Sequence, residues 1–101
     1  MSFVCVLRVD LHLPENGDLK GKRKELSSLK AQLQGRFGAA VAEVDHHDLW
    51  QRATLSIALV GRDAGPLEGH ADSLQRFVDS RLGDLTRWER RTLSADDLSG
   101  G

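Results

Sequence analysis

Residues 40–60 read AVAEVDHHDLWQRATLSIALV, in which a polar stretch separates two short apolar runs. The runs at 40–45 and 53–60 read as two strands, the second alternating between large apolar and small or polar side chains. Residues 43–53, between them, collect one of the two Trp residues, two of the four His, three carboxylates and an Arg. A Trp at a hairpin tip leaves a large apolar area in water. We therefore treat this hairpin as the centre of the fold and the best candidate for a functional site.

The segment before the hairpin predicts a strand followed by a helix. Residues 3–13 place apolar side chains at every second position, which is the period of a half-buried strand. A turn at residues 14–17, which includes Asn16, breaks this strand, and Asp18 can cap a helix. Leucines then recur at helical spacing, so we expect a helix over residues 19–36, ended by a glycine, with the leucine stripe inward.

The segment after the hairpin repeats the pattern. A turn at residues 61–65 precedes Pro66, which suits the first position of a helix that Gly83 ends. His70 falls within the apolar stripe of this helix and is predicted to be a core histidine rather than a ligand. Residues 85–93 predict a last strand that includes Trp88, and residues 94–101 predict a flexible polar tail.

The predicted order of strand, helix, strand, strand, helix, strand defines the fold class. With right-handed crossovers it closes as an α+β, ferredoxin-like βαββαβ sandwich, a four-stranded antiparallel sheet with two helices on one face. Residues 1–93 then form a single domain. In this topology the end of the first strand, the start of the first helix and the hairpin tip lie at the same end of the sheet. We expect the basic helix start and the hairpin to be about 10 Å apart.

Composition is that of one globular domain: 101 residues, 40% hydrophobic and 29% charged, with a formal net charge of −1. Residues 1–36 carry seven Lys/Arg and four Asp/Glu, whereas residues 37–101 carry seven and eleven. The chain therefore has a basic side that could hold a polyanion locally. The single cysteine, Cys5, predicts neither a disulfide nor a cysteine metal site. With no apolar run long enough for a bilayer, we expect a cytoplasmic protein without a membrane partner.

The first helix opens with Lys20, Lys22, Arg23 and Lys24. Lys22 falls within the leucine stripe, which an ordinary solvated basic face does not require. Its stem could lie along the core edge with the amine emerging at the sheet end. The alternative is that these cations are solvated or paired with nearby carboxylates of the hairpin and of Glu25.

The hairpin itself admits three readings. Trp50 and Arg52 are residue types often found as hot spots of interfaces, but Trp50 could instead fold back over the open end of the core. A metal site from Asp45, His46, His47, Asp48 and His12 is disfavoured, because adjacent strand residues point to opposite faces. We predict neither a metal nor another cofactor.

Several activities found on this topology lack their residues here. The open sheet face predicted from residues 4–8 and 54–58 has no aromatic platform for stacking RNA bases. A heavy-metal chaperone needs a cysteine pair after the first strand, and a phosphate loop needs more glycines than the segment 15–20 holds. No Ser or Cys nucleophile stands beside a base. A hydrolase using Asp45 or Asp48 with a His would need a pocket, so we predict no enzyme, no catalytic residue and no small-molecule substrate.

Six short runs of sequence resemble the YlxP-like family of small bacterial proteins. They are Leu11-His12-Leu13-Pro14, Leu19-Lys20-Gly21-Lys22-Arg23, Ser28-Leu29-Lys30, Arg36-Phe37, Val41-Ala42-Glu43-Val44 and Asp48-Leu49-Trp50-Gln51-Arg52-Ala53. The resemblance spans roughly residues 3–90. It implies a ferredoxin-like fold without an established activity. Genes of the family often neighbour those of a translation initiation factor and a ribosome-binding factor, so the resemblance implies a role in ribosome assembly or translation.

These observations give a leading hypothesis and a rival. In the first, a cytoplasmic accessory protein binds structured RNA or a ribosomal surface. The side chains predicted to make the contacts are Lys20, Lys22, Arg23, Lys30, Arg36, Trp50, Gln51 and Arg52. In the second, the protein is a self-associating interaction module, a homodimer formed through Trp50 and an exposed edge strand.

Overall fold

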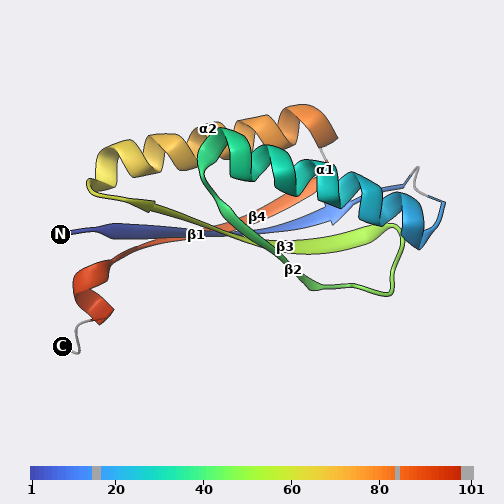
Figure 1. Cartoon of the computed structure of the whole chain (residues 1–101), viewed down its shortest axis with the longest axis horizontal. Helices are drawn as coiled ribbons and strands as arrows, with labels where there is room; N and C mark the ends of the chain where they lie inside the picture. Colours follow the sequence, from blue (N-terminus) through green and yellow to red (C-terminus); the bar gives the residue numbers. More distant parts are fainter. Residues whose placement is uncertain (15–16, 84, 99–101) are drawn as a thin grey trace.

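The computed structural model describes residues 1–14, 17–83 and 85–98, and its elements follow the predicted order. They are β1 (Phe3–His12), α1 (Leu19–Phe37), β2 (Ala40–Asp45), β3 (Arg52–Gly61), α2 (Ala64–Leu82), β4 (Thr86–Ser94) and a turn of 3-10 helix, η1 (Ala95–Leu98). The sheet order is β2-β3-β1-β4, with every neighbouring pair antiparallel. Figure 1 shows both helices on one face of this sheet. The chain therefore has the predicted ferredoxin-like fold.

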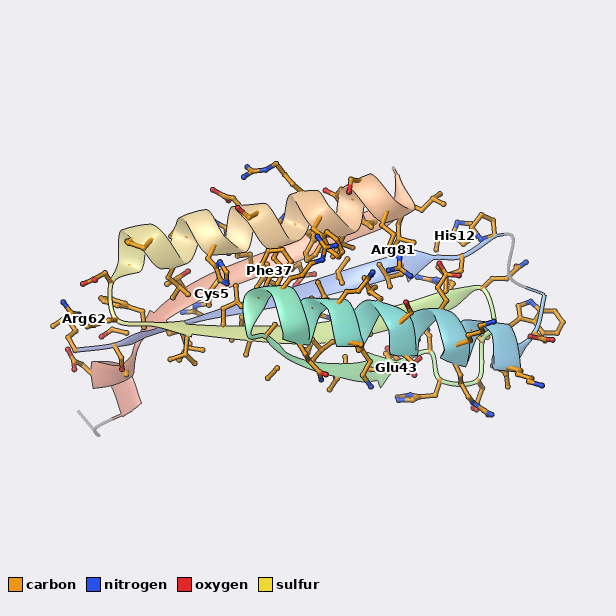
Figure 2. All side chains as sticks on the ribbon, turned by 45° about the horizontal axis from the view of Figure 1, so that its top comes forward. Cys5, His12, Phe37, Glu43, Arg62 and Arg81 are labelled. Carbon is orange, nitrogen blue, oxygen red and sulfur yellow. The ribbon has the colours of Figure 1, made fainter. Side chains whose placement is uncertain are left out.

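Alternation along the two central strands builds the core. Every second residue of β1 from Cys5 to Leu11 is buried, as are Leu55, Ile57 and Leu59 of β3. The helices cover these side chains with their apolar stripes, which are Leu26, Leu29 and Leu33 in α1 and Leu67, Ala71, Leu74 and Val78 in α2. Cys5 is a free, buried thiol within this core (Figure 2). The opposite face of the sheet is left open.

The helix ends follow local chemistry. Asp18 caps α1 by accepting a hydrogen bond of 2.7 Å from the Gly21 N–H. Gly38 ends α1 with a left-handed φ of 63°, a conformation that costs glycine little. The second helix begins at Ala64, two residues before the predicted Pro66. Pro66 still fits, because the N–H groups of the first turn have no partner within the helix.

The position of His70 differs from the prediction, and part of the predicted turn and tail is not described by the structure. His70 is not a core histidine: its residue is exposed, and its Nε2 lies 2.8 Å from the Phe37 carbonyl oxygen. It sits at the edge of the stripe, with its ring 5.4 Å from that of Phe37. Asn16 of the predicted turn and residues 99–101 of the predicted tail lie outside the described residues. Among the residues described, no helix is long and apolar enough to span a membrane.

A charged network ties β4 to α2 on the helix-covered face. Arg90 Nη2 donates to Glu68 Oε2 at 2.5 Å, and Arg90 Nη1 donates to Asp72 Oδ1 at 2.7 Å. The Thr92 hydroxyl donates to the other Glu68 oxygen. These contacts, the Thr92 hydrogen bond first and the Arg90 hydrogen bond next, lower the pKa of Glu68 below its ordinary value of 4.5.

This pKa shift predicts a pH dependence of stability. Because the folded-state pKa of Glu68 lies below the unfolded one, its contribution is complete above pH 4.5 and is lost as the pH falls through the folded value. Thermal denaturation of the native protein and of Glu68→Gln should therefore differ in Tm at pH 6, and the difference should shrink as the pH falls below 4.5. A difference that stays constant across this range would contradict the assignment.

Candidate functional site

Three segments meet at one end of the sheet, as the topology predicts. The backbone N–H of Leu13 donates to the Gln51 carbonyl at 2.7 Å, and Gln51 Nε2 donates to the Pro14 carbonyl at 3.2 Å. We call residues 12–14, 18–24 and 46–52 the hairpin end. Figure 2 shows His12 at this end of the molecule and Arg62 at the opposite one.

The ammonium group of Lys22 lies inside the hairpin end rather than on its surface. Its Nζ donates to the His46 carbonyl at 2.6 Å and to the Leu49 carbonyl at 2.7 Å. Lys22 is only 2% exposed, because its stem follows the leucine stripe of α1 toward the hairpin. A buried ammonium is tolerated only when it is paired and hydrogen-bonded. Lys22 therefore fastens α1 to the loop between β2 and β3.

Glu43 supplies the compensating charge. Its Oε2 lies 3.0 Å from Lys22 Nζ, an ion-pair distance, although this oxygen makes no directed hydrogen bond. Glu43 is opposite Leu55 in the β2–β3 register, so its side chain points to the helix-covered face, beside α1 (Figure 2). The register then shifts between Glu43 and Asp45, which leaves Val44 as the extra residue of a bulge.

The loop that Lys22 holds is a tight turn. The Leu49 N–H donates to the His46 carbonyl at 3.1 Å, and His46 has a left-handed φ of 63°. The His46 N–H donates to Asp45 Oδ1 at 2.7 Å, and this bond is the main cause of the lowered pKa of Asp45. His47 Nε2 lies 3.2 Å from the Glu43 carbonyl oxygen. The backbone of the loop is therefore fixed from several sides.

The outer surface of the hairpin is unusually apolar for an exposed loop. Trp50 is 50% exposed, Leu49 47% and Val44 45%. Trp50 thus neither packs fully into the core nor stands fully in water. Because Lys22 holds the backbone of the loop that carries Trp50, less backbone has to be ordered when a partner binds there, which lowers the entropy cost of binding.

The structure divides the predicted contact residues into three groups. Lys20, Arg23, Trp50, Gln51 and Arg52 are exposed at the hairpin end. Lys22 is buried there, so its amine does not emerge as expected and cannot reach a ligand. Lys30 and Arg36 lie farther along α1.

Those two residues have different surroundings. Lys30 lines a groove of about 300 Å³ between α1 and β2 that also contains Arg23 and Glu43. Arg36 is in the last turn of α1, sixteen positions from Lys20, which is roughly 24 Å along a helix. Its guanidinium lies 4.7 Å from the centre of the Phe77 ring. Arg36 therefore does not belong to the hairpin end.

The histidines of the loop do not converge on a metal. Within residues 1–14, 17–83 and 85–98, no three His, Cys, Asp or Glu side chains gather closely enough to hold an ion. His46 and His47 instead contact neighbouring loop atoms, the Asp45 carboxylate and the Glu43 carbonyl.

A row of basic residues on the open sheet face was not predicted as part of a site. Arg87 and Arg91 of β4 lie opposite Asp10 and Val6 of β1, and Arg8 lies opposite Glu89. The alternation of residues 86–94 could have shown this, because Arg87, Glu89 and Arg91 fall on the face opposite Trp88. The open face therefore continues the positive charge of the hairpin end.

Comparison with known proteins identifies the relatives of this chain. Residues 4–91 match the family described as "Protein of unknown function (DUF503)". The chain belongs to this family. The uncharacterized protein YlxP of Bacillus subtilis (strain 168) is 31% identical over 64 residues, which are 63% of this chain and 70% of that protein. The predicted YlxP-like resemblance is thereby confirmed, and the family match over residues 4–91 contains Lys22, Glu43 and the whole hairpin.

Solved structures support the fold alone. The de novo designed protein Foldit4 has a TM-score of 0.61 at 11% identity and covers 93% of this chain and 98% of its own. The crystal structure of 30S ribosomal protein S6 from Thermotoga maritima has a TM-score of 0.45 at 11% identity, with 95% and 92% covered.

Proposed function

We propose that this member of the DUF503 family is a cytoplasmic accessory protein that binds structured RNA or a ribosomal surface through its hairpin end. The observation that carries the proposal is the buried Lys22, which fixes a loop bearing a half-exposed Trp50 among exposed cations.

Four exposed cations at the hairpin end supply the electrostatic part of binding. They are Lys20, Arg23, Lys24 and Arg52. None of them forms an ion pair within the part of the chain that the structure describes, so their charge is available to an anion. Such contacts position a nucleic acid without reading its sequence.

Trp50 and Gln51 supply contacts that charge alone does not give. A half-exposed indole can stack on an unpaired base, and stacking contributes about 1–3 kcal/mol for each base. Gln51 is held by its bond to the Pro14 carbonyl, so its amide oxygen has a fixed direction. Together they favour single-stranded loops or bulges of a folded RNA over a regular duplex.

A protein interface is the second candidate, and one observation favours it. Three exposed apolar residues, which we call the apolar cluster, lie on the edge strand β2 (Val44) and on the loop that follows it (Leu49 and Trp50). Two copies of the chain could bury these clusters against each other as a homodimer.

Salt dependence distinguishes the two functions. Four phosphate contacts at about 0.7 each predict that the logarithm of the affinity for ribosomal RNA falls with the logarithm of salt concentration with a slope near −3. Fluorescence anisotropy of labelled ribosomal RNA fragments between 50 and 300 mM KCl would measure it. A slope indistinguishable from zero would contradict RNA recognition and leave the apolar cluster as the better candidate interface.

A further inference from the structure

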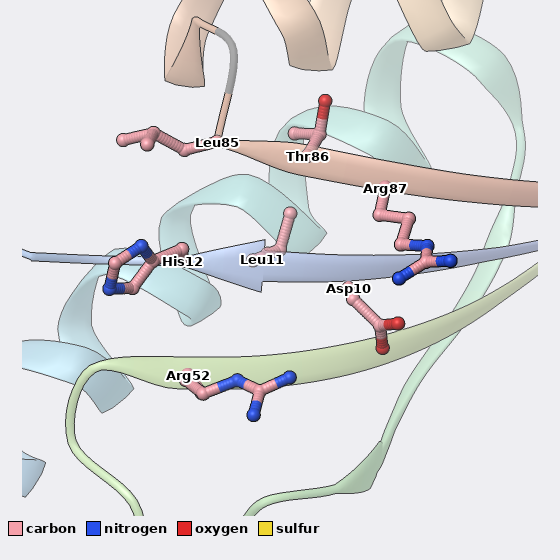
Figure 3. A pocket seen from close by; sticks show the side chains of 7 residues that line it. All are labelled: Asp10, Leu11, His12, Arg52, Leu85, Thr86 and Arg87. Atoms are coloured by element: carbon pink, nitrogen blue, oxygen red, sulfur yellow. The ribbon is translucent and has the colours of Figure 1, made fainter.

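A hollow of about 380 Å³ opens on the uncovered face of the sheet, next to the hairpin end (Figure 3). Arg52 of β3, Asp10 and His12 of β1, and Arg87 of β4 line it, with Leu85 at one side. The volume is within the range of small-molecule sites, although the hollow is open to solvent. It suits one charged group of a larger ligand.

Strand register brings the two arginines to this hollow. Arg52 is opposite His12 in the β1–β3 pair, and Arg87 is opposite Asp10 in the β1–β4 pair. Asp10 and His12 are two residues apart on one strand, so all four side chains project from the same face. Figure 3 shows Arg52 and Arg87 on strands at opposite sides of β1, with the Arg87 side chain directed toward β1 and the Arg52 side chain lying along β3.

The positive charge of the hollow is not neutralised. Asp10 is the only carboxylate among the lining residues described, and its Oδ1 accepts a hydrogen bond of 2.6 Å from the fully buried Thr54 hydroxyl. Arg52 and Arg87 have neither an ion pair nor a side-chain hydrogen bond within residues 1–14, 17–83 and 85–98. The hollow therefore contains two guanidinium groups and an imidazole but one carboxylate, which already accepts a hydrogen bond from Thr54.

We propose that the hollow binds the phosphate group of a nucleotide. Guanidinium groups present forked donors that match phosphate oxygens, and His12 adds a further donor. Leu85, which is 39% exposed, gives the attached sugar or base an apolar contact. The hollow shares Arg52 and His12 with the hairpin end, but Arg87 and Leu85 take no part in the proposed RNA surface, so this inference does not rest on RNA binding. The nucleotide is either free or the phosphorylated end of a strand.

An NMR titration tests the proposal. Amide shifts of the ¹⁵N-labelled protein would be followed with adenosine 5′-monophosphate and, separately, with inorganic phosphate. We expect saturable shifts in residues 10–12, 52 and 85–87, and a Kd raised about tenfold or more in Arg87→Gln, because one charge-assisted pair is lost. Arg91→Gln is the matched control, with the same change on the same strand and face but outside the hollow. Its Kd should stay within about twofold.

The source of the phosphate is decided by two hexauridylates that differ only in a 5′-phosphate. If the 5′-phosphorylated strand binds more tightly than the unphosphorylated strand and the mononucleotide, the hollow takes an RNA end. If the two strands bind equally and only the mononucleotide shifts the residues of the hollow, it takes free nucleotides. Absence of saturable shifts, or equal weakening by Arg87→Gln and Arg91→Gln, would overturn the proposal. The variant Lys20→Glu/Arg23→Glu changes no residue that lines the hollow. It is expected to lose binding of ribosomal RNA and to keep binding of adenosine 5′-monophosphate, which separates the two proposals.

Discussion

Replacing Lys22 with Met is expected to lower the free energy of unfolding by about 3–5 kcal/mol, far more than removal of an ordinary surface lysine. The apolar side chain still fills the end of the α1 stripe. However, the His46 and Leu49 carbonyls lose their donor, and Glu43 keeps a buried carboxylate oxygen without its counter-charge. Urea denaturation followed by circular dichroism measures the change.

Two further variants show whether the loss arises from the buried charge. Lys20→Met changes an exposed lysine on the same helix turn and should shift the unfolding free energy by no more than about 0.5 kcal/mol. Lys22→Met/Glu43→Leu removes both charges and should recover part of the stability, because removing both partners costs less than removing one. A loss below 1 kcal/mol in Lys22→Met, with no recovery in the double variant, would show that the ammonium is not holding the loop.

The sequence predicted the fold well because the apolar periods are strong. The strict alternation of residues 3–13 and the leucine stripe of residues 19–36 each match a period of one element. The structure differs mainly at ends, such as the start of α2 at Ala64. His70 shows the limit of this reasoning: a residue at the edge of a stripe can satisfy its ring nitrogen at a neighbouring carbonyl without being buried.

The candidate site was only partly predictable. Helical spacing placed Lys22 in the leucine stripe, but spacing cannot tell whether the amine emerges or remains inside. The partner of Lys22 that was not predicted is Glu43. It lies two residues after Val41 on β2, so both side chains are on the face that α1 covers. A lysine and a glutamate at inward positions of adjacent elements are a signal of a buried pair that the sequence does contain.

The open-face arginines needed the sheet order. Arg52 and Arg87 are far apart in the chain and carry no common motif, and only the β2-β3-β1-β4 order brings them to opposite sides of β1. Lys20 and Arg36 lie at opposite ends of α1, so the length of the helix separates two cations that were predicted to share one binding surface.

The double variant Lys20→Glu/Arg23→Glu should weaken RNA binding strongly. Each phosphate contact adds about 0.7 to the slope of log affinity against log salt concentration. One contact therefore raises the affinity roughly fivefold between 1 M and 0.1 M salt. Loss of two contacts therefore predicts at least about a 25-fold weaker affinity and a salt slope smaller by about 1.4, and the two new negative charges add repulsion. The matched control is Arg62→Glu/Arg76→Glu, which changes the net charge equally at exposed sites away from the hairpin end.

Affinity of these two double variants for the same ribosomal RNA, measured side by side at 0.1 M KCl, tests the hairpin end most directly. The predicted result is a loss of at least about 25-fold for Lys20→Glu/Arg23→Glu, with an effect several times smaller for Arg62→Glu/Arg76→Glu. Equal losses in the two variants would mean that RNA responds only to net charge, and would contradict a binding site at the hairpin end.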